Sequence, residues 1–161
     1  MRKILVLLLA LVATPALAAG WGSYENARFG YKIAVPPGFD RGREADNGDG
    51  LVFTKSDGTQ TLRVYGGNRM LGDFELEAGY SAEFYDAEGW DISYQRTAPS
   101  WASFSGSKGG KILYVRMISL CSGDQLATFA LTYPRSALSE MDAVVNKLVG
   151  SLKATGNGVS C

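Results

Sequence analysis

The sequence contains no histidine and only two cysteines. Without histidine, the chain cannot build the Ser-His-Asp or Cys-His arrangements of common nucleophilic hydrolases, or histidine-based zinc sites. Two cysteines cannot supply a four-cysteine metal site within one chain. A phosphate-binding loop is also absent, because residues 106–112 have the wrong glycine spacing and no hydroxyl residue after Lys111. The sequence therefore favours a protein that is not an enzyme and that holds no cofactor.

Long hydrophobic runs are missing except at the N-terminus. Arg2 and Lys3 precede an unbroken apolar run over residues 4–12, and small residues follow at Ala16 and Ala18. This layout is typical of a secretory signal, so we predict a signal peptide over residues 1–18 and a single domain over residues 19–161. The run is shorter than the roughly 20 residues that span a bilayer. We therefore expect a periplasmic or secreted protein with no membrane insertion after signal cleavage.

Neither sign of charge dominates, since 16 basic residues stand against 16 acidic ones. Arg2 and Lys3 would leave with the signal peptide, so the mature chain would be slightly acidic. A nucleic-acid partner needs a basic surplus, and the sequence has none.

The two cysteines, Cys121 and Cys161, are predicted to form a disulfide in an oxidising compartment. The bridge would close a loop of about 40 residues, for which the chain-entropy model gives roughly 4 kcal/mol of stability. Redox-active pairs usually have C-x-x-C spacing, so we interpret this pair as structural.

Alternating apolar residues predict several strands. Residues 23–35 indicate two short strands around a bend at residues 27–30. Asp57-Gly58 lies between strands 51–56 and 59–65, and this dipeptide favours a type I′ hairpin turn. A two-residue loop would place Phe53 opposite Leu62 and Leu51 opposite Val64 on one side of the hairpin. Further strands are expected at residues 90–94, 101–107, 111–121 and 126–133.

Two helices are predicted between and after these strands. Asp73 is expected to cap a helix that ends near Glu88, before Gly89. Its buried face is predicted to contain Phe74, Ala78, Ser81, Phe84 and Tyr85. Ser136 or Ser139 is expected to cap the last helix, whose apolar positions are Leu138, Met141, Val145, Leu148 and Leu152. The tail over residues 154–160 would fray unless the disulfide holds it. The sum is an α+β domain with a mostly antiparallel sheet flanked by helices.

The N-terminal region carries a family resemblance. Tyr24, Asn26, Phe29-Gly30-Tyr31, Pro36 and Phe39 form an aromatic strand that runs into a proline and another aromatic residue. This pattern resembles the start of PsbP-like domains, which include Mog-type Ran-binding proteins, and the similarity extends over roughly residues 21–153. The resemblance implies an α/β/α sandwich. It also implies a binding or assembly role, because those relatives are mostly non-catalytic.

The polar segment at residues 40–50 contains the candidate ligand-binding residues. Glu44, Asp46, Asn47 and Asp49 supply carboxylate and amide oxygens, which Ca²⁺ prefers. The spacing does not match an EF-hand, and Arg41 and Arg43 are close enough to neutralise the acids. A solvated turn is therefore the alternative. A carboxylate acid–base pair is a further alternative.

Serine and aromatic residues give two weaker signals. The strand at residues 101–107 is rich in serine, which indicates an open sheet face, an edge that pairs with a partner, or a polar outer face. Exposed tryptophan or tyrosine can stack on a sugar or hold a peptide.

These observations favour an exported, non-enzymatic binding or accessory module for an unknown protein or small ligand. A hydrolase or transferase that uses carboxylates alone is one alternative. A calcium-stabilised structural protein is the other.

Native protein should begin at Ala19 and contain no free thiol, because export would remove the signal peptide and oxidise both cysteines. Intact-mass spectrometry, with and without reduction and alkylation, measures both properties. A native mass that includes Met1, together with two alkylated thiols before reduction, would contradict export.

Overall fold

The computed structural model describes residues 20–158, which are organised around one large antiparallel sheet. Seven strands form it in the order β3-β4-β5-β9-β8-β7-β6. The strands are β3 (Phe39–Glu44), β4 (Gly50–Lys55), β5 (Thr61–Asn68), β6 (Asp91–Ala98), β7 (Trp101–Lys108), β8 (Lys111–Leu120) and β9 (Gln125–Pro134).

A smaller sheet and two helices complete the described structure. The small sheet has the order β1-β2-β10, formed by β1 (Gly22–Asn26), β2 (Tyr31–Val35) and β10 (Lys153–Ala154). The helices are α1 (Phe74–Ala87) and α2 (Leu138–Ser151). Short 3₁₀ turns, η1 (Cys121–Gly123) and η2 (Arg135–Ala137), follow β8 and precede α2. No helix among residues 20–158 is long and apolar enough to cross a membrane.

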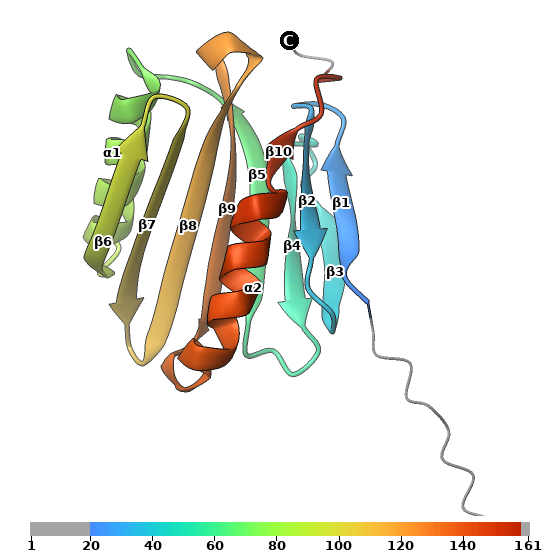
Figure 1. Ribbon diagram of the computed structural model, residues 1–161, viewed down its shortest axis with the longest axis vertical. Coiled ribbons are helices and arrows are strands. Elements are labelled where there is room, and N and C mark those ends of the chain that lie inside the picture. Colours follow the sequence, from blue (N-terminus) through green and yellow to red (C-terminus); the bar gives the residue numbers. More distant parts are fainter. Residues whose placement is uncertain (1–19, 159–161) are drawn as a thin grey trace, which may run out of the picture.

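The helices lie on opposite faces of the large sheet (Figure 1). On one face, α2 and the small sheet bury a core with β4, β5 and β9, in which Tyr31, Phe129 and Leu148 are fully buried. On the other face, α1 packs Phe74, Ala78 and Ala82 against β7, β8 and β9. The protein is therefore a mostly antiparallel α+β structure with a helix on each face of the large sheet, as predicted.

Each helix covers only part of its face. Figure 1 shows β6, β7 and β8 uncovered beside α2, while α1 lies behind those strands. On the opposite face, the outward side chains of β4 and β5 include the half-buried Val52 and Tyr65 and the exposed Arg63. Both half-faces are available for contacts with other molecules.

The β4–β5 hairpin has the predicted register but a different turn. Leu51 pairs with Val64 and Phe53 with Leu62, as expected. A type I′ turn requires positive φ at both central residues. At residues 57–58 only Gly58 has it, at 73°, so that prediction was wrong. Asp57 instead accepts hydrogen bonds from the backbone N–H and hydroxyl of Thr59, at 2.9 and 2.6 Å, in an Asx-type turn. Two positive φ values, 53° and 78°, occur at Gly109-Gly110 between β7 and β8.

The polar segment at residues 40–50, for which no strand was predicted, is mostly strand. Residues 39–44 form edge strand β3, which pairs with β4 and has a register shift between Arg41 and Glu44. Only residues 45–49 connect the two strands. Polarity was misleading here because charged residues and irregular pairing protect an exposed sheet edge, and they also characterise loops.

The helix predictions were right in position and partly wrong in detail. Asp73 caps α1 by accepting the N–H of Leu76 at 2.8 Å. Phe84 is 54% exposed, although it was assigned to the buried face, and Ala82 is buried instead. No side chain caps α2, because η2 leads directly into it through Ala137. Leu138 is exposed at the first turn rather than packed.

Four predictions concern the chain ends and the two cysteines. The signal peptide and Cys161 lie outside residues 20–158, so cleavage and the disulfide stay predictions. Strand β8 ends at Leu120, one residue earlier than expected, and Cys121 begins η1 with a φ of 48°. The tail over residues 154–160 was expected to fray unless the disulfide holds it, and its start is ordered: Ala154 pairs with β2, and the Thr155 N–H donates to the Gly30 carbonyl at 2.7 Å.

Replacing Gly50 with alanine should destabilise the protein by at least about 2 kcal/mol, because a Cβ there would lie 2.0 Å from the Val64 carbonyl oxygen. The matched control is Gly79→Ala, since a Cβ at this position in α1 meets open space. That variant should gain about 0.5–1 kcal/mol from helix propensity. Urea unfolding measures both values, and equal stabilities for the two variants would refute this packing.

Candidate binding site

The β3–β4 connection is fixed to the small sheet by buried polar side chains. Asn26, which is buried, donates its amide to the Gly48 carbonyl at 2.9 Å and accepts the Phe29 N–H at 2.9 Å. The Tyr31 hydroxyl donates to the Asp49 carbonyl at 3.0 Å. Asn26, Phe29 and Tyr31 belong to the aromatic pattern in the N-terminal region. The pattern therefore includes the residues that hold this connection in place.

The four predicted ligand-binding residues are close in sequence but bind different neighbours. Glu44 forms an ion pair with Arg41 at 3.4 Å, and Asp46 forms one with Arg43 at 2.7 Å. Asp49 accepts the Asn47 side-chain amide at 2.8 Å. Within residues 20–158, no group of three or more acidic, histidine or cysteine side chains converges in a way that could hold a metal ion.

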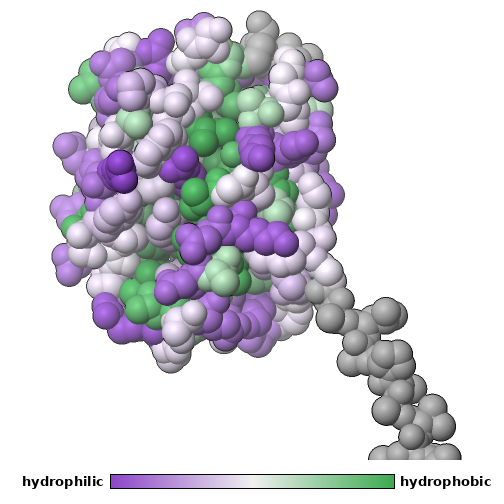
Figure 2. Space-filling view, viewed as in Figure 1, coloured by the Kyte–Doolittle hydropathy of each residue, from purple (hydrophilic) through white to green (hydrophobic). Residues whose placement is uncertain are grey.

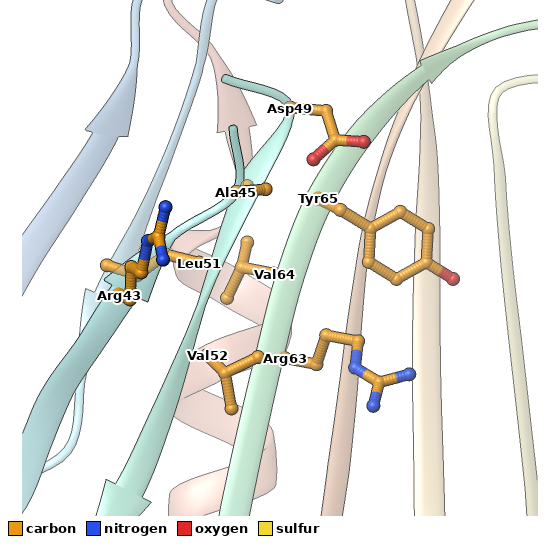
Figure 3. A pocket seen from close by; sticks show the side chains of 9 residues that line it. Arg43, Ala45, Asp49, Leu51, Val52, Arg63, Val64 and Tyr65 are labelled. Atoms are coloured by element: carbon orange, nitrogen blue, oxygen red, sulfur yellow. The ribbon is translucent and has the colours of Figure 1, made fainter. Parts of the chain in front are cut away.

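A pocket of about 350 Å³ lies beside this connection, on the face of the sheet opposite α2. Figure 3 shows Arg63 and Tyr65 projecting from β5 to the same side, with Asp49 near the connection and Arg43 on β3. Glu44, Asp46 and Asn47 are not among its lining residues. Of the four predicted residues, the structure places only Asp49 at the pocket.

The pocket continues along the sheet as a groove. Two further cavities, of about 240 and 210 Å³, also have Arg63 in their lining. The larger lies between β5 and α1 and includes Tyr65 and Phe84, and the smaller reaches Trp90. We call these three adjoining cavities the Arg63 groove.

An apolar stripe borders the groove. Of the seven large hydrophobic side chains exposed among residues 20–158, five lie on α1 or just before it. Leu76, Tyr80 and Phe84 follow one another at four-residue spacing, so they share one side of the helix. Leu76 is 57% exposed and Tyr80 is 61% exposed. Leu76, Tyr80 and Phe84 are called the α1 stripe below.

Arg63 is one of four charged side chains that line the groove, together with Arg43, Asp49 and Glu77. The ion pairs formed within residues 20–158 do not involve Arg63. The Glu77 carboxylate also lines the groove, but it accepts the backbone N–H groups of Met70 and Leu71 at 3.0 and 2.9 Å. Burial raises the pKa values of the Tyr65 and Tyr85 phenols, whereas nearby Arg63 acts in the opposite direction on both. The phenols therefore stay neutral, and Arg63 forms no ion pair among the described residues.

Sequence reasoning missed the Arg63 groove and the α1 stripe. The four-residue spacing of Leu76, Tyr80 and Phe84 was visible in the sequence. The prediction nevertheless gave α1 a single apolar side, the buried one, whereas the helix also has an exposed apolar side. Nothing in the sequence indicates that Arg63 lines three cavities, because their other walls come from distant segments.

Comparisons with known proteins identify the fold. The structure is similar to cyanobacterial PsbP (CyanoP) from Synechocystis sp. PCC 6803, with a TM-score of 0.64 and 12% identity over 88% of this chain and 96% of that one. It is also similar to the Ran-binding protein Mog1p of Saccharomyces cerevisiae, with a TM-score of 0.62 and 12% identity over 85% of this chain and 96% of that one. No family model matches the sequence, and no curated protein matches it. The chain therefore has the PsbP-like and Mog-type fold, as the resemblance implied.

Replacing Tyr31 with phenylalanine should cost about 1–2 kcal/mol near neutral pH, because the Asp49 carbonyl loses its donor. Burial raises the pKa of the Tyr31 phenol above its ordinary value of 10.0. The stability that Tyr31 contributes is therefore complete below about pH 10. Above that value the unfolded chain loses the phenol proton while the folded protein keeps it, so the free energy of unfolding falls by up to about 1.4 kcal/mol per pH unit. The stability difference between wild type and variant should shrink above pH 10.

Chemical unfolding from pH 7 to 11 tests this effect. The control is Tyr80→Phe, which changes an exposed phenol and should follow wild type throughout. A constant difference between wild type and Tyr31→Phe across the range would contradict the assignment.

Proposed function

We propose that this protein is an exported, non-enzymatic binding module that takes a protein partner along the α1 stripe and the Arg63 groove. The observation that carries the proposal is the placement of three large apolar side chains on the exposed side of one helix, beside an arginine without an ion-pair partner among the described residues. Apolar anchors surrounded by polar groups are typical of protein interfaces. The partner surface should contain apolar side chains and at least one carboxylate that reaches Arg63.

The fold comparison supports a binding role in general terms. Mog1p is a Ran-binding protein, and CyanoP shares the same fold without close sequence similarity. Identities of 12% support the fold alone, so neither Ran nor a photosystem is proposed as a partner here. Export is part of the proposal because of the N-terminal signal pattern.

The two alternative functions receive less support from the geometry. Carboxylate-only catalysis needs two acids that face a common substrate position. Glu44 and Asp46 each pair with a different arginine, and Asp49 binds Asn47. A calcium-stabilised structure would have to break these contacts first. Equal unfolding temperatures in excess Ca²⁺ and in EDTA would reject calcium stabilisation.

The partner-binding proposal predicts that Leu76→Ser, Tyr80→Ser and Phe84→Ser together abolish capture of a specific partner. The three side chains are exposed, so the triple variant should still fold. Affinity capture from the periplasmic or secreted fraction, followed by quantitative mass spectrometry, compares wild type with this variant. A partner should bind wild type at least tenfold more than the variant, since each lost anchor costs about 1–2 kcal/mol.

Two further variants make the result specific. Leu138→Ser changes an exposed leucine on α2 and should capture the same partner as wild type. Arg63→Gln should weaken capture and make it less sensitive to salt. If wild type, Leu138→Ser and the triple variant capture the same proteins in equal amounts, the α1 stripe is not the binding surface.

A further inference from the structure

The sheet half that α2 leaves uncovered contains two matching rows of side chains. Arg96 on β6 pairs with Ser103 on β7, which pairs with Arg116 on β8. In the next row, Tyr94 pairs with Ser105 and Ser105 pairs with Tyr114. Directly paired residues of antiparallel strands share a face of the sheet. Small serines therefore lie between large side chains in both rows.

These rows form a trough along β7. Its floor is the row Ser103, Ser105 and Ser107, in which Ser103 is buried and bound by Arg116, and its walls are Tyr94 and Arg96 on one side and Tyr114 and Arg116 on the other. Adjacent strands lie about 4.8 Å apart, so the walls rise from strands about 10 Å apart. The floor extends about 13 Å, since four residues separate Ser103 from Ser107. We call this feature the serine trough.

Trp101 closes the end of the trough where the arginines lie. The Arg116 guanidinium carbon is 4.2 Å from the centroid of the Trp101 ring, and that of Arg96 is 5.7 Å from it. Stacking on the indole keeps both guanidinium groups near one position. The result is a concentrated positive charge beside Ser103.

Arg116 has unused hydrogen-bonding capacity. Its Nη1 donates to the Ser103 hydroxyl at 3.1 Å, but its buried Nε has no hydrogen-bond partner. Neither Arg96 nor Arg116 takes part in an ion pair within residues 20–158. A half-buried cation without a counter-ion is unfavourable, so the site is suited to an anionic group from another molecule.

The opposite end of the trough opens toward α2. A cavity of about 480 Å³ there is lined by Ser105, Ser107 and Tyr114 from the sheet and by Asp142 from α2. Asp91 pairs with Ser107 at this end, so Asp91 and Asp142 lie away from Arg96 and Arg116, and Arg135 lines the same cavity. In Figure 2, which shows this side, the surface over β6–β8 is mostly of intermediate hydropathy, with hydrophilic groups between. The trough is therefore polar along its middle, cationic at the Arg96 and Arg116 end, and carries charges of both signs at the end near α2.

We propose that the serine trough binds a short acidic saccharide, with its carboxylate between Arg96 and Arg116. Serine and tyrosine hydroxyls both donate and accept hydrogen bonds, which matches sugar hydroxyls. Aromatic walls can stack on the apolar faces of sugar rings. A peptide cannot bind in the trough by strand addition to β7, because the β7 backbone already pairs with β6 and β8.

Isothermal titration calorimetry on the mature protein tests this proposal with four probes. These are the trimer of galacturonic acid, the corresponding neutral trimer of galactose, inorganic phosphate and tetra-aspartate. The uronate trimer should bind at least about tenfold more tightly than the neutral trimer, and this preference should weaken with added salt. It should also bind more tightly than phosphate or tetra-aspartate.

Variants locate the ligand within the trough. Arg96→Gln and Arg116→Gln should each remove most of the preference for the charged trimer, and Arg116→Lys should restore only part of it. Ser105→Leu should block binding while keeping both arginines. Lys32→Gln, which changes an exposed cation on β2 of the small sheet, is the matched control and should bind like wild type. Arg96 is exposed, so its variant is informative even if Arg116→Gln is unstable.

Several results would overturn the proposal. Equal binding of the two trimers, or no binding of the uronate at millimolar concentration, would exclude an acidic-saccharide site. Phosphate binding as tightly as the uronate would indicate a simple anion site. Tighter binding of tetra-aspartate would indicate an acidic peptide ligand. Unchanged affinity in both Arg96→Gln and Ser105→Leu would place any ligand elsewhere.

Discussion

One helix cannot cover one face of a seven-stranded sheet. Strands spaced about 4.8 Å apart make such a sheet about 29 Å wide, whereas a helix with its side chains is about 10 Å across. The chain places one long helix on each face, and adds the small β1-β2-β10 sheet on the α2 side only. Because α1 and α2 lie over opposite halves, the sheet retains two uncovered areas, one on each face. The Arg63 groove and the serine trough occupy these two areas.

The uncovered areas differ in how they avoid a large apolar surface. On the α1 side, threonine, tyrosine and arginine face outward from β5 and β9, and apolar side chains concentrate on the neighbouring helix. On the α2 side, serine replaces larger residues along β7, and aromatic and arginine side chains flank it. In both areas an arginine remains without an ion-pair partner among the described residues, Arg63 in one and Arg116 in the other. Such side chains suit two different ligands, an apolar protein surface and a polar anionic molecule.

Much of the fold could be predicted because local signals agreed with each other. The Leu51–Val64 and Phe53–Leu62 pairs followed from loop length alone, although the type of turn did not. Asp73 marked the start of α1 through a capping interaction that needs only nearby residues. The edge strand β3 was missed because a protected edge and a loop have the same composition. Phe84 was misplaced because α1 has apolar residues on two sides, and only the sheet decides which side is buried.

The candidate site was harder to predict because charge is visible in a sequence while its partners are not. Glu44, Asp46 and Asp49 attracted attention, yet nearby arginine and asparagine side chains engage all three. In contrast, the rows of the serine trough follow from two short turns. Pro99-Ser100 joins β6 to β7 and places Arg96 opposite Ser103, and Gly109-Gly110 joins β7 to β8 and places Ser103 opposite Arg116. The sequence does not indicate which face of those strands a helix covers. That depends on where the chain crosses the whole sheet. Local pairing therefore determines which side chains meet, while helix placement determines whether a ligand can reach them.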